Sequence, residues 1–403
     1  MKHLHLENIG PISLVDIDLQ RYNIFIGPQS SGKSTIAKMI SFCTWIEKRA
    51  LTTLSENVFS NELEFIEHVE DYHKMHDYFN EKSFLEYKSQ NIHIIYLDRK
   101  LNIKILDKIS YKRKKILYIP SDRNLVAMPR LDRFVFETNT NLRSFSYDWL
   151  DARGFYDKAH RLSILDLNME YYYDKDAKKV SQDRIIHTNG KTYDIALYDA
   201  SSGLQSITPL LLSLNYYSKQ YFADYGKITS YERVQELKQL ENKINSLDQE
   251  GVLTAILGPN NIVSSITRQN LYTNLTIPSS CDFIIEEPEQ NLFPAAQESL
   301  IYWTIERIKD PERANSIVIT THSPYILFAL NNCLIGGLVG DKLENQRLQS
   351  RNSWINPSEV AVFEIHDGTL KTIQDEEGLL DNNYLNLAYK KISAEYMTML
   401  SQL

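Results

Sequence analysis

The sequence contains little cysteine, no long apolar run and no excess of positive charge. Its three cysteines, Cys43, Cys281 and Cys333, are far apart and odd in number. They form neither a disulfide framework nor a metal-ligand spacing, which favours a reducing, cytoplasmic compartment. No apolar stretch approaches the roughly 18 to 20 residues of a membrane span. The N-terminus also lacks the apolar core of a signal peptide. We therefore expect no membrane partner.

The charge balance is mildly acidic. A formal net charge of −8 does not indicate nucleic-acid binding, because phosphate neutralisation needs clustered Lys and Arg. One such cluster exists, since residues 99–115 contain eight Lys or Arg against one Asp. Two interpretations stay open. The cluster is either a charged β-hairpin edge that resists aggregation, or a contact with DNA phosphates.

A chain of 403 residues is longer than one compact core requires. We expect an α/β head over residues 1–330 and a C-terminal α/β extension over 331–403. A mixed insertion, 51–115, is predicted as helix to about residue 88, with strands near Ile92–Leu97 and Ile103–Ile109.

A second insertion, 219–277, has helical character. Four apolar residues recur in it at spacings of three and four, which are those of a heptad seam: Leu237, Leu240, Ile244 and Leu247. The clean part of the repeat is short, so we expect an amphipathic helix that serves dimerisation or partner docking.

Residues 27–34, GPQSSGKS, match the phosphate-binding P-loop pattern G-x-x-x-x-G-K-[ST]. An apolar run that reads as a buried parallel strand ends at Ile26, and a helix is expected from Ser34. The loop can turn its backbone N–H groups toward phosphates. Lys33 would reach the β- and γ-phosphates, and Ser34 would hold Mg²⁺. The predicted nucleotide-binding residues of this loop are Gly27, Pro28, Gln29, Ser30, Ser31, Gly32, Lys33, Ser34 and Thr35.

A second apolar strand, in FIIEEPE (283–289), ends on two acids. Glu286 is the candidate for the Mg²⁺ shell, and Glu287 is the candidate general base that activates water. The alternative is an acidic helix N-terminus.

A third apolar strand, in IVITTHSP (317–324), ends on His322. Catalytic residues of such sheets gather outside the carboxyl ends of the strands, so His322 could contact the γ-phosphate or the attacking water. The segment SSGLQ (201–205) precedes an apolar helix and could offer backbone N–H groups to a phosphate. A simple helix N-cap is the alternative.

The segments GPQSSGKST, SSGLQ, IEEPEQNLFP and TTHSP, in this order, resemble the heads of ABC-type ATPases of the RecF/SMC/OLD-like branch. The segment IPSDR (119–123) resembles a Pro-acid-Arg segment of OLD-like and anti-phage ATPases. The resemblance implies a P-loop NTPase fold with inserted helical subdomains, ATP and Mg²⁺ as ligands, and hydrolysis that uses Lys33, Glu287 and His322. It also implies a head-to-tail homodimer, in which each ATP lies between Lys33 of one copy and the signature residues Ser202, Gly203 and Gln205 of the other.

This chain departs from the family pattern at several positions. Glu286 stands where transporter-type heads have Asp, Leu204 replaces a signature glycine, and Phe293 stands where a D-loop Asp would be. Arg123 is a candidate near the nucleotide. OLD-family chains usually append a TOPRIM nuclease, for which the 331–403 segment is too short.

We therefore expect a dimeric ATP-driven switch that regulates a separate effector, a nuclease or a toxin, in bacterial anti-phage defence. The alternative is a RecF-like repair ATPase that clamps duplex DNA. A nucleotide-gated scaffold without important turnover also stays open, whereas the large insertions disfavour a transporter subunit.

Overall fold

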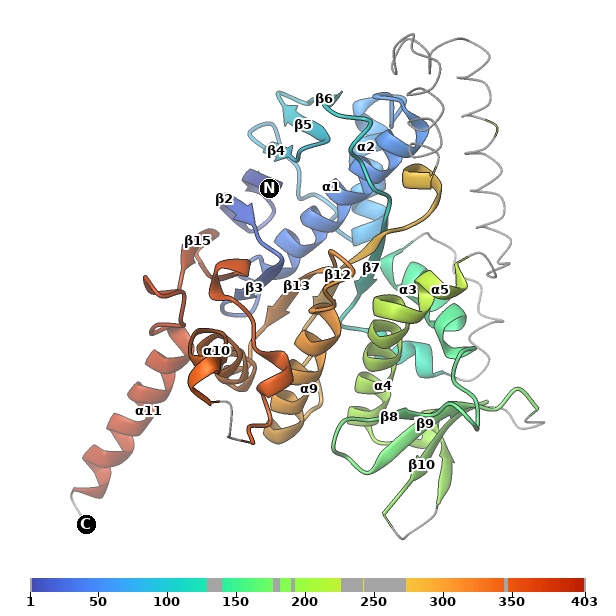
Figure 1. Ribbon diagram of the computed structural model, residues 1–403. Coiled ribbons are helices and arrows are strands. Elements are labelled where there is room, and N and C mark those ends of the chain that lie inside the picture. Colours follow the sequence, from blue (N-terminus) through green and yellow to red (C-terminus); the bar gives the residue numbers. More distant parts are fainter. Residues whose placement is uncertain are drawn as a thin grey trace.

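The computed structural model describes residues 2–128, 140–176, 182–189, 193–225, 242, 273–343 and 347–401. Its centre is a sheet of eleven strands in the order β6-β5-β4-β1-β2-β15-β14-β3-β13-β12-β7. A second sheet of four strands, β11-β10-β9-β8, is drawn below α4 in Figure 1. The predicted α/β class with a mixed sheet is therefore confirmed.

The strands of the large sheet are β1 (Lys2–Ile9), β2 (Ile12–Leu19), β3 (Tyr22–Ile26), β4 (Phe84–Lys88), β5 (Ile92–Leu97), β6 (Lys100–Ile105), β7 (Lys114–Ile119), β12 (Ser280–Glu286), β13 (Ser316–Thr321), β14 (Val360–His366) and β15 (Thr369–Thr372). Those of the small sheet are β8 (Leu162–Ser163), β9 (Met169–Tyr173), β10 (Asp183–His187) and β11 (Asp194–Ala196). The helices are α1 (Lys33–Thr53), α2 (Glu62–His73), α3 (Asn141–Arg153), α4 (Ser202–Asn215), α5 (Tyr221–Asp224), α9 (Pro294–Ile308), α10 (Pro324–Val339) and α11 (Tyr384–Leu400).

Five neighbouring strands, β7, β12, β13, β3 and β14, run parallel. All five residues of β3 are buried, as expected of a largely apolar strand that is covered on both faces. The register places Thr321 beside Ile26 and Glu286 beside Thr320. Consequently the residues that follow β3, β12 and β13 meet at the carboxyl ends of the parallel strands, which form one edge of the sheet.

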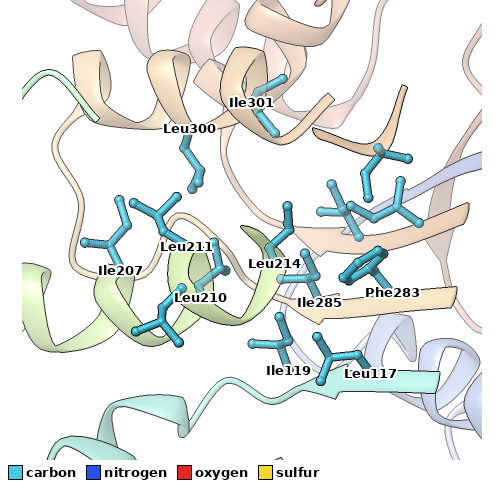
Figure 2. Close-up of a cluster of buried hydrophobic side chains, with 14 of the residues drawn as sticks. Leu117, Ile119, Ile207, Leu210, Leu211, Leu214, Phe283, Ile285, Leu300 and Ile301 are labelled. Carbon is cyan, nitrogen blue, oxygen red and sulfur yellow. The ribbon is translucent and has the colours of Figure 1, made fainter. Parts of the chain in front are cut away.

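The two faces of this sheet carry separate cores, because alternate side chains of a strand point to opposite sides. From β3, Phe25 joins the face covered by α1, whereas Ile24 and Ile26 join the opposite face. Figure 2 shows part of that second core, where side chains from β7, β12, α4 and α9 meet. The core therefore fixes the start of α4 relative to the strand ends.

The antiparallel half of the sheet corrects one prediction. Residues 84–88 form strand β4, paired with β1 and β5, rather than the end of a helix. Alternation explains the difference, since Leu85 and Tyr87 are buried while their neighbours are more accessible. In β9 of the small sheet, Tyr171 and Tyr172 are buried and Tyr173 is partly accessible.

The C-terminal segment contributes to the same sheet, because β14 pairs with β3 and β15 pairs with β14 and β2. Helix α11 then extends away from the body (Figure 1). The predicted heptad residues Leu237, Leu240, Ile244 and Leu247 lie outside the described residues. Across the described ranges, none of the helices is both long and apolar enough to cross a membrane.

Candidate nucleotide-binding site

The P-loop connects the buried strand β3 to helix α1. Gly27 has φ +152°, and a Cβ at this position would lie 2.5 Å from the carbonyl oxygen of Ile365 in β14. Only glycine therefore allows the loop to pass this close to the neighbouring strand. Helix α1 begins after Gly32 with no side-chain cap and no acid in its first turn. Its N-terminal N–H groups and dipole are thus available to an anion.

Lys33 lies inside the loop with 4% of its surface exposed. Its ammonium group donates to the carbonyl oxygens of Gly27 at 2.8 Å and Pro28 at 2.7 Å. Burial lowers the pKa of Lys33 to about 8, against the opposing effect of the Glu287 and Glu289 carboxylates. The cation is therefore close to the acids that follow β12.

Glu286 is the last residue of β12 and is 5% exposed. Its Oε2 accepts from the backbone N–H of Ser121 at 3.3 Å. Its Oε1 is buried, and none of the described residues places a donor in good hydrogen-bonding geometry to it. The Tyr118 hydroxyl is nonetheless close enough that the Glu286 charge, after burial, helps to raise its pKa. A buried carboxylate with a free oxygen is the chemistry expected of a cation ligand.

Glu287 and His322 face each other from adjacent strand ends. The His322 Nε2 atom lies 3.3 Å from Oε1 of Glu287. This hydrogen bond is the main cause that lowers the pKa of Glu287, and Lys33 and Arg123 add to it. Glu287 also has φ +43°, an uncommon backbone conformation for a residue with a side chain, of the kind that concentrates at functional sites.

Glu289 is a residue of this cluster that sequence reasoning did not assign. Its Oε1 accepts from the Thr321 hydroxyl and from the backbone N–H of His322, both at 2.7 Å. Its Oε2 is buried and receives no hydrogen bond from the part of the chain that the structure describes. The EEPE segment does contain a third acid two residues after Glu287. No sequence pattern, however, shows which backbone N–H group this carboxylate will bind.

Arg123 lies behind the acids. It is 0% exposed, and its guanidinium donates to the carbonyl oxygens of Glu286 and Glu287, both at 2.8 Å. It also donates to the carbonyl oxygen of Ser206 in α4, at 3.1 Å. Burial lowers the pKa of Arg123 to about 10. Because all its described bonds run to backbone, Arg123 holds the β12 strand end against α4.

The signature segment lies at the start of α4. Ser201 is the N-cap of this helix, and Ser202 is exposed. A Cβ on Gly203 would lie 2.8 Å from the carbonyl oxygen of Asn291, so the segment packs closely on the loop after β12. The Gln205 amide donates to the carbonyl oxygens of Tyr198 at 2.6 Å and Ala200 at 2.9 Å, which is a structural use of that side chain.

The C-terminal helix also contacts the P-loop. The Tyr384 hydroxyl donates to the Gly27 carbonyl oxygen at 3.0 Å, so this oxygen accepts from both Tyr384 and Lys33. The backbone N–H of Tyr384 donates to Glu364 of β14 at 3.1 Å. Sequence reasoning missed this contact because more than 350 residues separate Tyr384 from the loop.

The residues present fit a magnesium nucleotide. Buried polar atoms that find no hydrogen-bond partner within the described ranges gather here, among them the Ser31 hydroxyl and one oxygen each of Glu286 and Glu289. Glu289 is close enough for its charge to act on the Lys33 ammonium group, and Lys33 is the first residue of the uncapped helix α1. Ser34 and Glu286 would supply the oxygen ligands that Mg²⁺ prefers.

In the basic segment 99–115, some Lys and Arg side chains are paired or buried and others are exposed. Lys114 forms an ion pair with Asp282, Lys115 with Asp148, and Arg99 with Glu81. Arg113 is buried and donates to the Leu275 carbonyl oxygen. Lys100, Lys104 and Lys112 are exposed. The part of the cluster available to a phosphate backbone is thus smaller than the sequence suggests.

No family model matches the chain, and no curated protein matches it. The solved structures similar to it include the SMC head domain from Thermotoga maritima (12% identity, TM-score 0.39, covering 93% of this chain and 98% of that chain). They also include the recombination mediator RecF (10%, 0.31, 92% and 97%) and an ATP-binding cassette of an ABC transporter in its ADP conformation (12%, 0.31, 94% and 93%).

The fold is an α/β fold with a mixed sheet, whose parallel strands carry a P-loop between β3 and α1. This description rests on the strand order and the loop geometry given above.

Proposed function

We propose that the chain binds Mg²⁺·ATP at the P-loop and hydrolyses it. The proposal is carried by the convergence of Lys33, Glu287 and His322 at one sheet edge, where Glu287 and His322 lie 3.3 Å apart. The backbone N–H groups of residues 29–35 and the Lys33 ammonium group would hold the phosphates. Ser34 and Glu286 would hold Mg²⁺, which would neutralise phosphate charge.

In this proposal Glu287 orients the attacking water and accepts its proton. The lowered pKa of Glu287 keeps the carboxylate ionised, and its constrained backbone fixes where the carboxylate points. Orientation matters more than base strength here, because phosphoryl transfer has a loose transition state. His322 positions the carboxylate, and Glu289 positions His322 through its backbone N–H.

An ATPase assay on the purified full-length protein tests the proposal. We expect Glu287→Gln to abolish turnover while ATP still binds, and Lys33→Ala to lose ATP binding. The exposed Glu376→Gln is the matched control and should behave as wild type. ATP binding by Lys33→Ala with unchanged affinity would overturn the P-loop assignment.

We also propose a head-to-tail homodimer that closes on two ATP molecules. The exposed Ser202 and the 58% exposed ring of Phe293 support it, because both flank the packed pair Gly203 and Asn291. Sedimentation velocity of Glu287→Gln with ATP should show a dimer that Phe293→Lys removes. A monomer under these conditions contradicts the dimer but leaves the ATPase proposal standing.

The proposed cellular role is regulation of a separate nuclease or toxin in anti-phage defence, which rests on the family resemblance. The alternative, a RecF-like clamp on duplex DNA, is supported by the exposed Lys100 and Lys104 on the sheet-edge strand β6. Co-purification with neighbouring gene products tests the first role. The DNA-clamp role would be established by duplex binding that depends on salt and that the double substitution Lys100→Gln with Lys104→Gln weakens.

A further inference from the structure

A cluster of histidines and carboxylates lies on the outer face of β1 and β2. His3 and His5 are two residues apart in β1, so both point to the same side of the sheet. The register places Asp16 directly opposite His5 and Asp18 opposite His3. The inward residues of the same strands, such as Leu4 and Leu6, are fully buried, which fixes which side the polar residues face.

Three atoms of this cluster have the arrangement of a metal-ligand set. One ring nitrogen each from His3 and His5 and a carboxylate oxygen of Asp16 all lie within 4.8 Å of one another. The His3 Nε2 atom is 3.2 Å from Asp16 Oδ1, and the His5 Nδ1 atom is 3.8 Å from Asp16 Oδ2. A tetrahedral ion with bonds of about 2.0–2.1 Å needs ligand atoms roughly 3.3 Å apart. Small side-chain rotations would therefore suffice.

The second nitrogen of each ring already has a carboxylate partner. His3 Nδ1 lies 3.0 Å from Asp18 Oδ1, and His5 Nε2 lies 2.9 Å from Glu7 Oε1. In metal sites such a carboxylate orients the ring, fixes its tautomer and increases the basicity of the ligating nitrogen. Simple charge pairing explains one carboxylate for each histidine, but it does not require Asp16 to face the remaining nitrogens of both rings.

We propose that His3, His5 and Asp16 form a binding site for a divalent transition-metal ion of the zinc class, with Asp18 and Glu7 as positioning residues. Two imidazoles and one carboxylate suit Zn²⁺ and related ions, whereas Mg²⁺ and Ca²⁺ prefer oxygen ligands alone. Three protein ligands leave one position for water. The site shares no residue with the candidate nucleotide site, so it stands independently of the proposed function.

Zinc titration of the untagged full-length protein tests the proposal, with excess Mg²⁺ present to occupy the candidate nucleotide site. We expect one zinc ion per chain, measured by calorimetry and by metal content after dialysis. His3→Gln and His5→Gln should each lose it. Asp18→Asn should keep the stoichiometry and weaken the affinity about 10- to 100-fold.

His366→Gln is the matched control, because His366 is an exposed histidine paired with a single carboxylate, that of Asp367. It should bind zinc as the wild type does. Far-UV circular dichroism of every variant shows whether the fold is kept, and Co²⁺ absorption gives a second readout of imidazole ligation. No zinc binding by the folded wild type, or equal binding by His3→Gln and His5→Gln, would show that the cluster is only a set of cross-strand charge pairs.

Discussion

The two ends of strand β12 both carry acids, but the acids have opposite environments. Near the amino end, Asp282 is 4% exposed and accepts from Lys2 at 2.9 Å, Lys114 at 3.0 Å and the Ser316 hydroxyl at 2.7 Å. At the carboxyl end, Glu286 is equally buried and has one oxygen without a hydrogen-bond partner among the described residues. The hydrogen bonds and ion pairs of Asp282 link strands to one another, whereas the unpaired oxygen of Glu286 can bind a ligand.

The same contrast extends to the backbone. Glu287 has a left-handed φ at the open end, while Asp282 lies inside a regular parallel ladder. Unsatisfied polar atoms and strained dihedrals reduce stability and persist where a ligand compensates for them. We therefore expect substitutions at the carboxyl end to change chemistry and substitutions at the amino end to change stability.

The largest expected effect is that of Glu287→Gln. Removing a general base typically costs about 10²–10⁴-fold in rate, so kcat for ATP should fall by this factor, as steady-state phosphate release measures. The unfolding midpoint in urea should not decrease. A strong loss of stability with kcat retained would show that Glu287 at the carboxyl end of β12 has a structural role rather than a catalytic one.

Asp282→Asn should mainly destabilise the fold. Breaking a buried ion pair costs about 3–5 kcal/mol, and we expect the low end because Lys2 and Lys114 are 24% and 27% exposed. The free energy of unfolding in urea measures this loss. The exposed Asp98→Asn is the control and should stay within about 0.5 kcal/mol.

The Asp282 pair also predicts a pH dependence of stability. Burial alone would raise the pKa of Asp282, but the Lys114 and Lys2 ammonium groups lower it well below its ordinary value. A lowered pKa stabilises the folded state above the unfolded pKa of about 3.9. The contribution disappears as the pH falls further, and acid titration of Asp282→Asn should lack it.

Arg123→Lys tests the link between α4 and the acids. Lysine keeps the charge but loses the planar fork that binds several carbonyl oxygens at once. A small misplacement of catalytic groups can cost about 10²-fold, so kcat should fall by up to this factor. The affinity for ATP should remain, which separates this variant from Lys33→Ala. Unchanged kcat in a folded Arg123→Lys protein would contradict the positioning role.

The smallest effect concerns Lys33, whose pKa of about 8 lies near physiological pH. ATP phosphates favour the charged form, so the affinity for ATP should weaken as the pH rises above about 8, by up to tenfold per unit. The dissociation constant for ATP, measured at about pH 7, 8 and 9 on both sides of the pKa of about 8, gives this slope. Lys33→Arg stays charged and should remove the pH dependence.

Local patterns predicted the elements that hold the site, because P-loops and acid-tipped buried strands have short signatures. The strands ending at Ile26, Glu286 and Thr321 were therefore predictable to within a residue or two. The position of β14 beside β3 was not predictable, because sheet order depends on contacts hundreds of residues apart. The role of Arg123 was equally hidden, since its partners are carbonyl oxygens that every sequence contains.

The hydrogen bond from Tyr384 to Gly27 connects the P-loop to helix α11, which is accessible to solvent. All three native cysteines are buried, and burial raises the pKa of Cys333, which keeps its thiol unreactive. Helix α11 buries none of its side chains, so Ala394→Cys would be the accessible thiol of the described chain. A fluorophore attached there would test whether nucleotide loading changes the environment of this helix, whose first residue binds the loop.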